Sequence, residues 1–354
     1  MLWLVFILSS VLIIAAGIML TRAAEIIAEK TSLGQLLVGT ILLSAATSLP
    51  ELVTGSTAAM ISAPDLALGN ILGSSIFNLA VLALIDVLEG PGPLMLKVNL
   101  AQLMPGMLMI LMSGLIGTAL VIYTIMGISP PSFWMGPESL LLIVVYLLGL
   151  RLIYRYHNRL SPAEAEVLIA DISSELSGPS ESTHLDRIAI PRFSLDQAYL
   201  IFVLAAVIIL LAGRRLTTTA DELAVVTGLG HTFLGPVLLA AVTSLPELVT
   251  SLTAFRIGAF NLAVGNVLGS NLINLLILVW IDGFFPGSLL AASSPANLLP
   301  LFSSLLMTVL IMLGLFYRSR KSILRLGWGA ALLLLIYFLT IFFLYITGTA
   351  LPLY

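Results

Sequence analysis

One stretch of this sequence occurs twice, and the duplication constrains the fold more than any other feature. The two copies span residues 39–86 and 235–282, at a constant offset of 196 residues without a gap. Identical residues occupy 28 of the 48 paired positions. Scattered matches arise between any two apolar segments, but the pentapeptide Thr-Ser-Leu-Pro-Glu occurs in both copies, at 47–51 and at 243–247. The chain therefore contains two copies of one structural unit.

The composition predicts an integral membrane protein. Of the 354 residues, 59% are apolar and 9% are charged, and the mean hydropathy is +1.13. A soluble domain carries about 25% charged residues, so this chain has too few to cover a water-facing surface. The absence of cysteine excludes disulfides and thiolate ligands, and three histidines argue against a histidine-built metal site. We expect a lipid bilayer around the chain, no cofactor and no nucleic-acid partner, and the sequence indicates no protein partner.

Ten apolar segments are long enough to cross a bilayer, which takes about 20 residues. The first one follows no basic residue, so we interpret it as a membrane span and not as a cleaved signal peptide. The second, third, seventh and eighth segments contain the repeated stretches. The ten predicted spans are 2–20, 33–62, 65–88, 101–125, 137–155, 197–213, 229–256, 260–285, 298–317 and 327–348.

The predicted spans form two groups of five around a polar segment. Residues 1–155 would be the N-terminal repeat, 156–196 a linker and 197–354 the C-terminal repeat. The linker is the most acidic part of the chain. We interpret it as a solvated tether and not as a calcium-sensing segment, because it contains no spaced calcium-binding loop.

Basic residues predict the orientation in the membrane. With the N-terminus outside, thirteen basic residues fall in inside loops and span ends, and only Arg214 and Arg215 fall outside. Cytoplasmic loops carry an excess of Lys and Arg. We therefore expect a multi-pass plasma-membrane protein with both termini outside and a cytoplasmic linker.

The two copies would enter the membrane from opposite sides, because one lies in the second span and the other in the seventh. The predicted fold is an all-α membrane protein of about ten transmembrane helices in two inverted five-helix repeats. Many secondary transporters have this arrangement, and their substrate site lies near the midplane where the repeats meet.

The repeated pentapeptide gathers oxygen atoms at membrane depth. In a helix, Thr47 and Ser48 lie on the same face as Glu51. Pro50 has no N–H, so the carbonyl of Ala46 loses its normal partner and must be satisfied or line a cavity. The second copy has the same parts in Val242, Thr243, Ser244 and Glu247, and the following spans add two pairs spaced four apart, Ser74 with Asn78 and Ser270 with Asn274.

These residues are a set of hard oxygen donors with two negative charges. Such donors suit Ca²⁺ and, by extension, Na⁺, and do not suit soft transition metals. A buried carboxylate in a membrane is costly and indicates function, and two of them in a duplicated motif strengthen that indication.

With these motifs the chain resembles the sodium/calcium exchanger branch of the cation/calcium exchanger superfamily, in its prokaryotic form. The resemblance implies a Ca²⁺ antiporter with alternating access, and no enzyme. It implies that Glu51 and Glu247 are the principal Ca²⁺ ligands, that Thr47, Ser48, Thr243 and Ser244 supply oxygens to both ions, and that Ser74, Asn78 and Ser270 complete the Na⁺ sites. Related exchangers often have Asp where this chain has Asn274, so the site here holds two carboxylates instead of three. The number of Na⁺ ions and any use of K⁺ therefore stay open.

Three other functions are alternatives to Na⁺/Ca²⁺ exchange. A Ca²⁺/H⁺ exchanger would use protonation of the two glutamates, but the proton-coupled branch typically has Gly-Asn-Ala-Ala-Glu in place of the pentapeptide found here. A membrane-embedded hydrolase would need an activated serine, and no His or Lys lies beside Ser48 or Ser244 in sequence. A passive cation channel fits poorly because inverted repeats favour alternating access.

Overall fold

A computed structural model describes residues 2–31, 33–89, 94–128, 135–159, 194–227, 239–317, 322–323 and 326–350. This part of the chain is helical apart from one antiparallel pairing of two short strands, so the predicted all-α class is confirmed. Most of the predicted linker and the first four residues of the second repeated stretch lie outside the described residues, and the domain limits stay a prediction.

The elements follow one another along the chain as two similar series. They are α1 (Leu2–Lys30), α2 (Gly34–Leu37), the π-helix η1 (Val38–Leu43), α3 (Ser44–Thr47), α4 (Leu49–Met60), α5 (Pro64–Glu89), η2 (Leu94–Leu96), η3 (Leu100–Gln102), α6 (Leu103–Leu120), η4 (Val121–Ile125), α7 (Pro137–Arg159), α9 (Leu195–Thr227), α11 (Ala240–Thr243), α12 (Leu245–Arg256), α13 (Phe260–Asp282), α14 (Leu289–Ala292), η6 (Pro295–Asn297), α15 (Leu298–Tyr317), β1 (Ser322–Ile323), β2 (Leu326–Gly327) and α16 (Trp328–Ala350).

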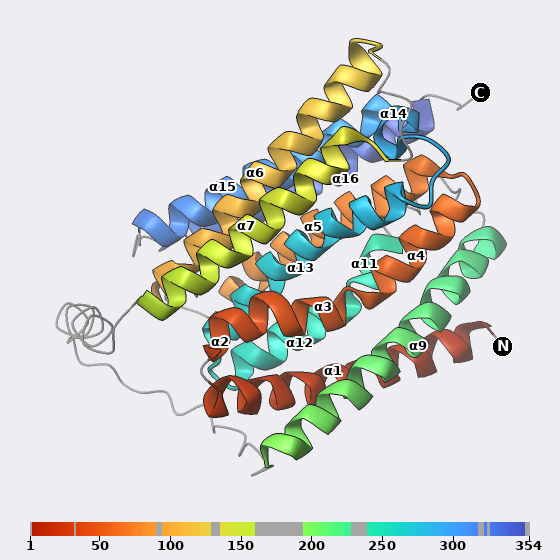
Figure 1. Cartoon of the computed structure of the whole chain (residues 1–354). Helices are drawn as coiled ribbons and strands as arrows, with labels where there is room; N and C mark the ends of the chain where they lie inside the picture. Colours follow the sequence, from red (N-terminus) through yellow and green to blue (C-terminus); the bar gives the residue numbers. More distant parts are fainter. Residues whose placement is uncertain are drawn as a thin grey trace.

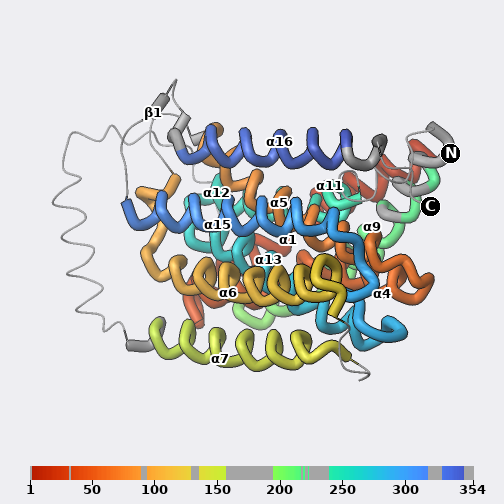
Figure 2. The backbone as a smooth tube through the Cα atoms, turned by 90° about the horizontal axis from the view of Figure 1, so that it is seen from above, coloured from red at the N-terminus to blue at the C-terminus, as the bar shows by residue number. Residues whose placement is uncertain are grey.

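The two series run in opposite directions through the same bundle. In Figure 1, α2 to α4 run from left to right, whereas α11 and α12 run from right to left, and α1 and α9 are likewise opposed. Helices α5 and α13 lie in the centre, with the pair α1 and α9 on one side and α6, α7, α15 and α16 on the other. Figure 2 shows the same bundle at right angles, with α7 and α16 on opposite margins. The inversion predicted from the span count is therefore present in the fold.

Eight helices within the described residues are long and apolar enough to cross a membrane, and the bent pair Gly34–Thr47 and Leu49–Met60 makes a ninth. The remaining predicted span, 229–256, which is the seventh along the chain, is described from residue 239 as α11 and α12. Helix α1 extends to Lys30, past the predicted end at 20, and α9 extends to Thr227, past the predicted end at 213. The predicted spans ended before Arg22 and Arg214, but the helical backbone continues beyond both.

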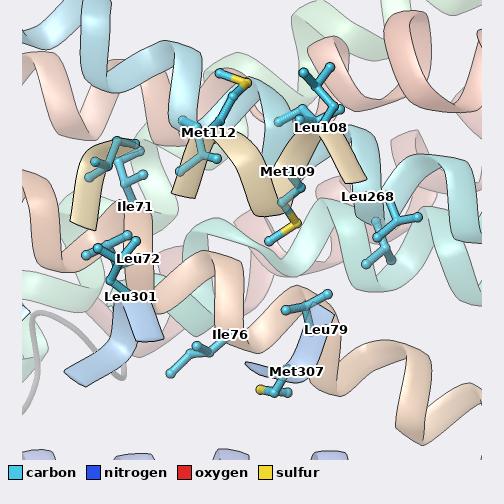
Figure 3. Close-up of a cluster of buried hydrophobic side chains, with 14 of the residues drawn as sticks. Ile71, Leu72, Ile76, Leu79, Leu108, Met109, Met112, Leu268, Leu301 and Met307 are labelled. Atoms are coloured by element: carbon cyan, nitrogen blue, oxygen red, sulfur yellow. The ribbon is translucent and has the colours of Figure 1, made fainter. Parts of the chain in front are cut away.

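Apolar side chains fill the space between the central and outer helices. Figure 3 shows Ile71, Leu72, Ile76 and Leu79 of α5 near residues of α6, α13 and α15. Met109 and Met112 of α6 are fully buried in this cluster. The cluster holds α5 and α13 in place on the side away from α1 and α9, and so fixes the helices that contribute to the site.

A buried aspartate near the end of α5 and another at the end of α13 accept hydrogen bonds from nearby residues. Asp86 accepts a hydrogen bond from the backbone N–H of Leu94. Asp282 accepts from the N–H of Leu289 at 2.8 Å and from Ser139 Oγ at 2.7 Å. Both residues are buried, so they bond the segment that follows each helix and do not face the water.

Candidate cation site

Each copy of the pentapeptide breaks its helix at the serine. Helix α3 ends at Thr47, Ser48 has φ −82° and ψ 9°, and α4 begins at Leu49 with Pro50 in its first turn. The helical axis bends by 46° at this point. Ser244 has nearly the same backbone angles, φ −85° and ψ 10°, between α11 and α12. Proline is well placed in a first helical turn, where its missing N–H would have had no intrahelical partner.

The breaks bring each glutamate against the serine of the other copy. Ser48 Oγ donates to Glu247 Oε1 at 3.1 Å, and Ser244 Oγ donates to Glu51 Oε1 at 3.0 Å. All four side chains are buried, with exposures of 0–1%. The sequence predicted that these residues meet at one site. It also placed Ser48 beside Glu51 on one helix face, but the hydrogen bonds cross between the copies.

Hydroxyl groups of the two copies pair in the same crossed manner. Thr47 Oγ1 lies 3.2 Å from Ser270 Oγ, and Thr243 Oγ1 lies 3.3 Å from Ser74 Oγ. Each threonine hydroxyl is also 3.2 Å from a backbone carbonyl in its own helix, that of Ser44 or Ala240. These four hydroxyl residues, all predicted site members, therefore lie together between the broken helices and the central helices α5 and α13.

The paired asparagines of the central helices are buried but differ in their bonding. Asn78 Nδ2 donates to Asn271 Oδ1 at 3.0 Å, and Asn271 Nδ2 donates to the carbonyl of Ser75 at 3.1 Å. The Oδ1 of Asn78 has no hydrogen-bond partner within the described residues, and neither do the two polar atoms of Asn274. The orientation of the Asn78 amide is therefore fixed by Asn271, whereas no such bond fixes that of Asn274.

Three further asparagines belong to the site although the sequence analysis assigned them no role. Asn70 and Asn266 accept from Thr243 Oγ1 and Thr47 Oγ1, each at 3.4 Å, and Asn271 holds Asn78 as described. The signal for the first two was available, because they are identical in both copies and lie one helical turn before Ser74 and Ser270. Asn271 had no such signal, since its counterpart is Ser75.

The site offers carboxylate and amide oxygens that the protein does not satisfy. Among the described residues, Glu51 Oε2, Glu247 Oε2, Asn78 Oδ1 and Asn274 Oδ1 are buried without a partner. Ala46 and Val242 are buried one turn before the prolines. Their carbonyls were predicted to be free, but that of Val242 accepts a backbone hydrogen bond at the end of α11. Buried acceptors with no donor have a large desolvation cost, which a bound cation offsets. No three His, Asp or Glu side chains gather in the described part, which agrees with a site of two carboxylates and neutral oxygens.

The fold and site together define a class: an all-helical membrane protein of inverted repeats with a buried, oxygen-lined site at their junction. The family model described as "Sodium/calcium exchanger protein" matches residues 1–155 and 197–346. The chain belongs to this family, which is one of transporters. The resemblance seen in the sequence is thereby confirmed.

Individual relatives agree with the family assignment. The sodium/calcium exchanger MaX1 of Methanosarcina acetivorans is 24% identical over 361 residues, which cover 96% of this chain and 98% of the relative. The inner membrane protein YrbG of Escherichia coli is 28% identical over 280 residues, 78% of each chain. Among solved structures, the sodium-calcium exchanger NCX_Mj soaked with 2.5 mM Na⁺ and 0.1 mM Ca²⁺ has a TM-score of 0.68 at 20% identity and covers 95% of this chain. This likeness supports the fold.

Proposed function

We propose that this protein is a secondary antiporter that exchanges Ca²⁺ for Na⁺ across the plasma membrane by alternating access. The observation on which the proposal depends is the pair of buried glutamates, each held by the serine of the opposite repeat and each with one oxygen unpaired. Two carboxylates neutralise one Ca²⁺ or two Na⁺, so either load leaves no net charge in a low-dielectric site.

The geometry and the donor chemistry support the following ligand roles. Glu51 and Glu247 would bind Ca²⁺ through their free oxygens. The hydroxyls of Thr47, Ser48, Thr243 and Ser244, with Ser74 and Ser270, would complete the coordination of Na⁺ together with the carbonyls of Ala46 and Val242. Asn78 and Asn274 would contribute neutral amide oxygens. Hard oxygen ligands of this kind are what both ions prefer.

The orientation remains as the basic residues predict it, with both termini outside and the linker in the cytoplasm. An ion held between broken helices that run in opposite directions would have a similar set of helices on either side of it, one set toward each face of the membrane. In inverted-repeat transporters such a site opens to each side of the membrane in turn.

Transport of radioactive Ca²⁺ into proteoliposomes tests the proposal, with Na⁺ and H⁺ gradients imposed independently. We expect an outward Na⁺ gradient to drive Ca²⁺ uptake and a pH gradient alone to have no effect. Uptake that ignores Na⁺ and follows the pH gradient would replace the proposal with Ca²⁺/H⁺ exchange. A variant with Glu29→Gln, which removes one exposed acidic group far from the pentapeptide in sequence, serves as the charge control.

A further inference from the structure

One buried carboxylate outside the central site has an oxygen without a partner. Glu25 of α1 is only 5% exposed. Its Oε1 accepts a hydrogen bond from Gln35 Nε2 at 2.8 Å, whereas Oε2 is buried and has no partner within the described residues. Burial of an acidic group in a membrane helix has a large desolvation cost. The single hydrogen bond from the Gln35 amide leaves one of the two carboxylate oxygens of Glu25 without a donor.

Glu25 lies one helical turn beyond a buried polar contact between α1 and α12, the helix of Glu247. Thr250 Oγ1 lies 3.2 Å from the carbonyl oxygen of Glu247, and Thr21 Oγ1 lies 3.3 Å from the carbonyl oxygen of Thr250. Glu25 follows Thr21 by one helical turn, on the same face of α1. Thr21 and Thr250 are fully buried, and the surrounding contact between α1, α12 and their neighbours is apolar.

The same spacing recurs in the first helix of the second repeat. Helix α1 contains Gly17, Thr21 and Glu25, and α9 contains Gly, Thr and Asp at positions 213, 217 and 221, again at the offset of 196. A Cβ atom on Gly17 would lie 2.9 Å from Val249 of α12, and one on Gly213 would lie 2.7 Å from Pro50 of α4. Gly17 of α1 and Gly213 of α9 therefore each lie against the broken helix of the other repeat. If Glu25 served only to bond Gln35, there would be no reason for an acidic residue at position 221 as well.

We propose that Glu25 is a cation-binding group on the path between the central site and the membrane side where α1 ends. Asp221 has the equivalent position on α9, which runs in the opposite direction and so serves the other side. The free Oε2 of Glu25 would bind a hard cation transiently on its way to or from the central site. The inference rests on the proposed cation exchange, and it adds to that function one acidic group for each side.

The test measures half-saturating ion concentrations separately at the two faces of the membrane. Because the chain has no cysteine, a single Cys in place of the exposed Ser194, at the start of α9, reports the orientation of each preparation to an impermeant maleimide. Ca²⁺ and Na⁺ are titrated in turn at each face for wild type, Glu25→Gln, Asp221→Asn and the control Glu29→Gln. Glutamine at 25 retains an acceptor for Gln35, so the contact between α1 and α2 survives while the charge is lost.

Glu25→Gln is expected to raise the half-saturating concentration of Ca²⁺, Na⁺ or both by about three- to tenfold at the face where α1 ends, because an acidic group raises the local cation concentration. At the opposite face the change stays below about twofold, and Asp221→Asn shows the mirror pattern. An effect on one ion alone identifies that ion as the one Glu25 binds. Unchanged values in both variants, equal effects at the two faces, or the same effect from Glu29→Gln would overturn the inference.

Two further measurements distinguish a failure of this inference from misfolding of the variant and from a failure of the proposed exchange. If Glu25→Gln does not assemble, Glu25→Asp retains the charge and is expected to keep wild-type ion dependence, and a tenfold loss there contradicts the inference. Wild-type protein that shows no Na⁺-driven Ca²⁺ flux refutes the proposed function. Wild-type flux with no face-specific change in the variants refutes only the role of Glu25.

Discussion

The two halves of the candidate cation site share their glutamate, serine and threonine residues, but the hydrogen bonds around their asparagines differ. In the second half, Asn266 Nδ2 donates to both Thr250 Oγ1 and Ser251 Oγ at 2.9 Å. In the first half, the residue equivalent to Ser251 is Gly55, and Asn70 Nδ2 has no partner within the described residues. The comparison shows that a duplicated site can retain its oxygen donors while the hydrogen bonds to its buried asparagines differ between the halves.

The asparagines nearer the bundle centre show the opposite asymmetry. Asn78 of the first half is fixed by Asn271, whereas Asn274 of the second half has neither polar atom bonded. Two of the bonding side chains of the second repeat, Ser251 and Asn271, stand where the first repeat has Gly55 and Ser75. The third, Thr250, has the identical residue Thr54 as its counterpart. The second repeat thus supplies the polar side chains that orient the amides, and substitutions can test how far the halves are equivalent.

The largest effect is expected from the glutamates, and it should be equal in the two halves. Glu51→Gln and Glu247→Gln each remove one of two charges that face a divalent ion in a low-dielectric site, so Ca²⁺ transport should fall by at least about 100-fold. Initial rates of Ca²⁺ uptake by purified, folded variants measure this. A variant that transports at the wild-type rate would remove that glutamate from the site.

Introducing a third negative charge should have different effects at the two asparagine positions, 78 and 274. Asn274→Asp adds a carboxylate at an amide with no bonds to lose, so the protein should fold normally and Ca²⁺ flux should become more sensitive to membrane potential. Asn78→Asp loses the donor to Asn271 and sets two acceptors against each other, which should cost about 1–3 kcal/mol of stability.

Thermal melting and flux under K⁺/valinomycin potentials measure these two outcomes. Wild-type flux that is itself insensitive to potential supports exchange of two Na⁺ for one Ca²⁺, and strong sensitivity supports three. Equal melting temperatures for the two aspartate variants would contradict the different bonding of Asn78 and Asn274.

The crossed serines should again behave alike. Ser48→Ala and Ser244→Ala each remove one hydrogen bond to a carboxylate, and the two bonds have nearly the same length. Loss of such a bond should weaken Ca²⁺ binding by about tenfold. Titration of Ca²⁺-dependent flux measures the change, and a difference above about fivefold between the two variants would show that the halves bind the ion unequally.

The smallest effect is expected at the orienting residue Asn271. Asn271→Ser gives the second repeat the residue that the first one has, and frees the Asn78 amide to rotate. Na⁺ and Ca²⁺ dependence should weaken by about two- to fivefold without loss of the fold, since one neutral hydrogen bond contributes about 1 kcal/mol. Ser75→Gly, which leaves the carbonyl acceptor in place, is the matched control and should have little effect on ion dependence. Equal effects of the two changes would show that Asn271 acts only through packing.

The sequence predicted the inverted repeat and the members of the site because both follow from an ungapped duplication. The offset of 196 pairs Ser48 with Ser244 and Glu51 with Glu247, and the span count sets their opposite directions. It did not predict that Ser48 bonds to Glu247 instead of Glu51, since that depends on how the broken helices pack. Asn271 was missed because comparison of the copies reveals only what they share, and the ends of α1 and α9 were missed because polar residues beyond Arg22 and Arg214 interrupt the apolar pattern that marks a span.

The crossed bonds between Ser48 and Glu247 and between Ser244 and Glu51 have the pattern of a two-fold interface, in which residue i contacts residue j and j contacts i. Such an interface is normally made by two identical subunits, and here one chain makes it with itself. Each repeat supplies one glutamate and one serine to these bonds, so a half-chain would hold only half of the proposed site. Two half-chains produced separately would regain function only by inserting in opposite orientations and associating through this same self-complementary surface.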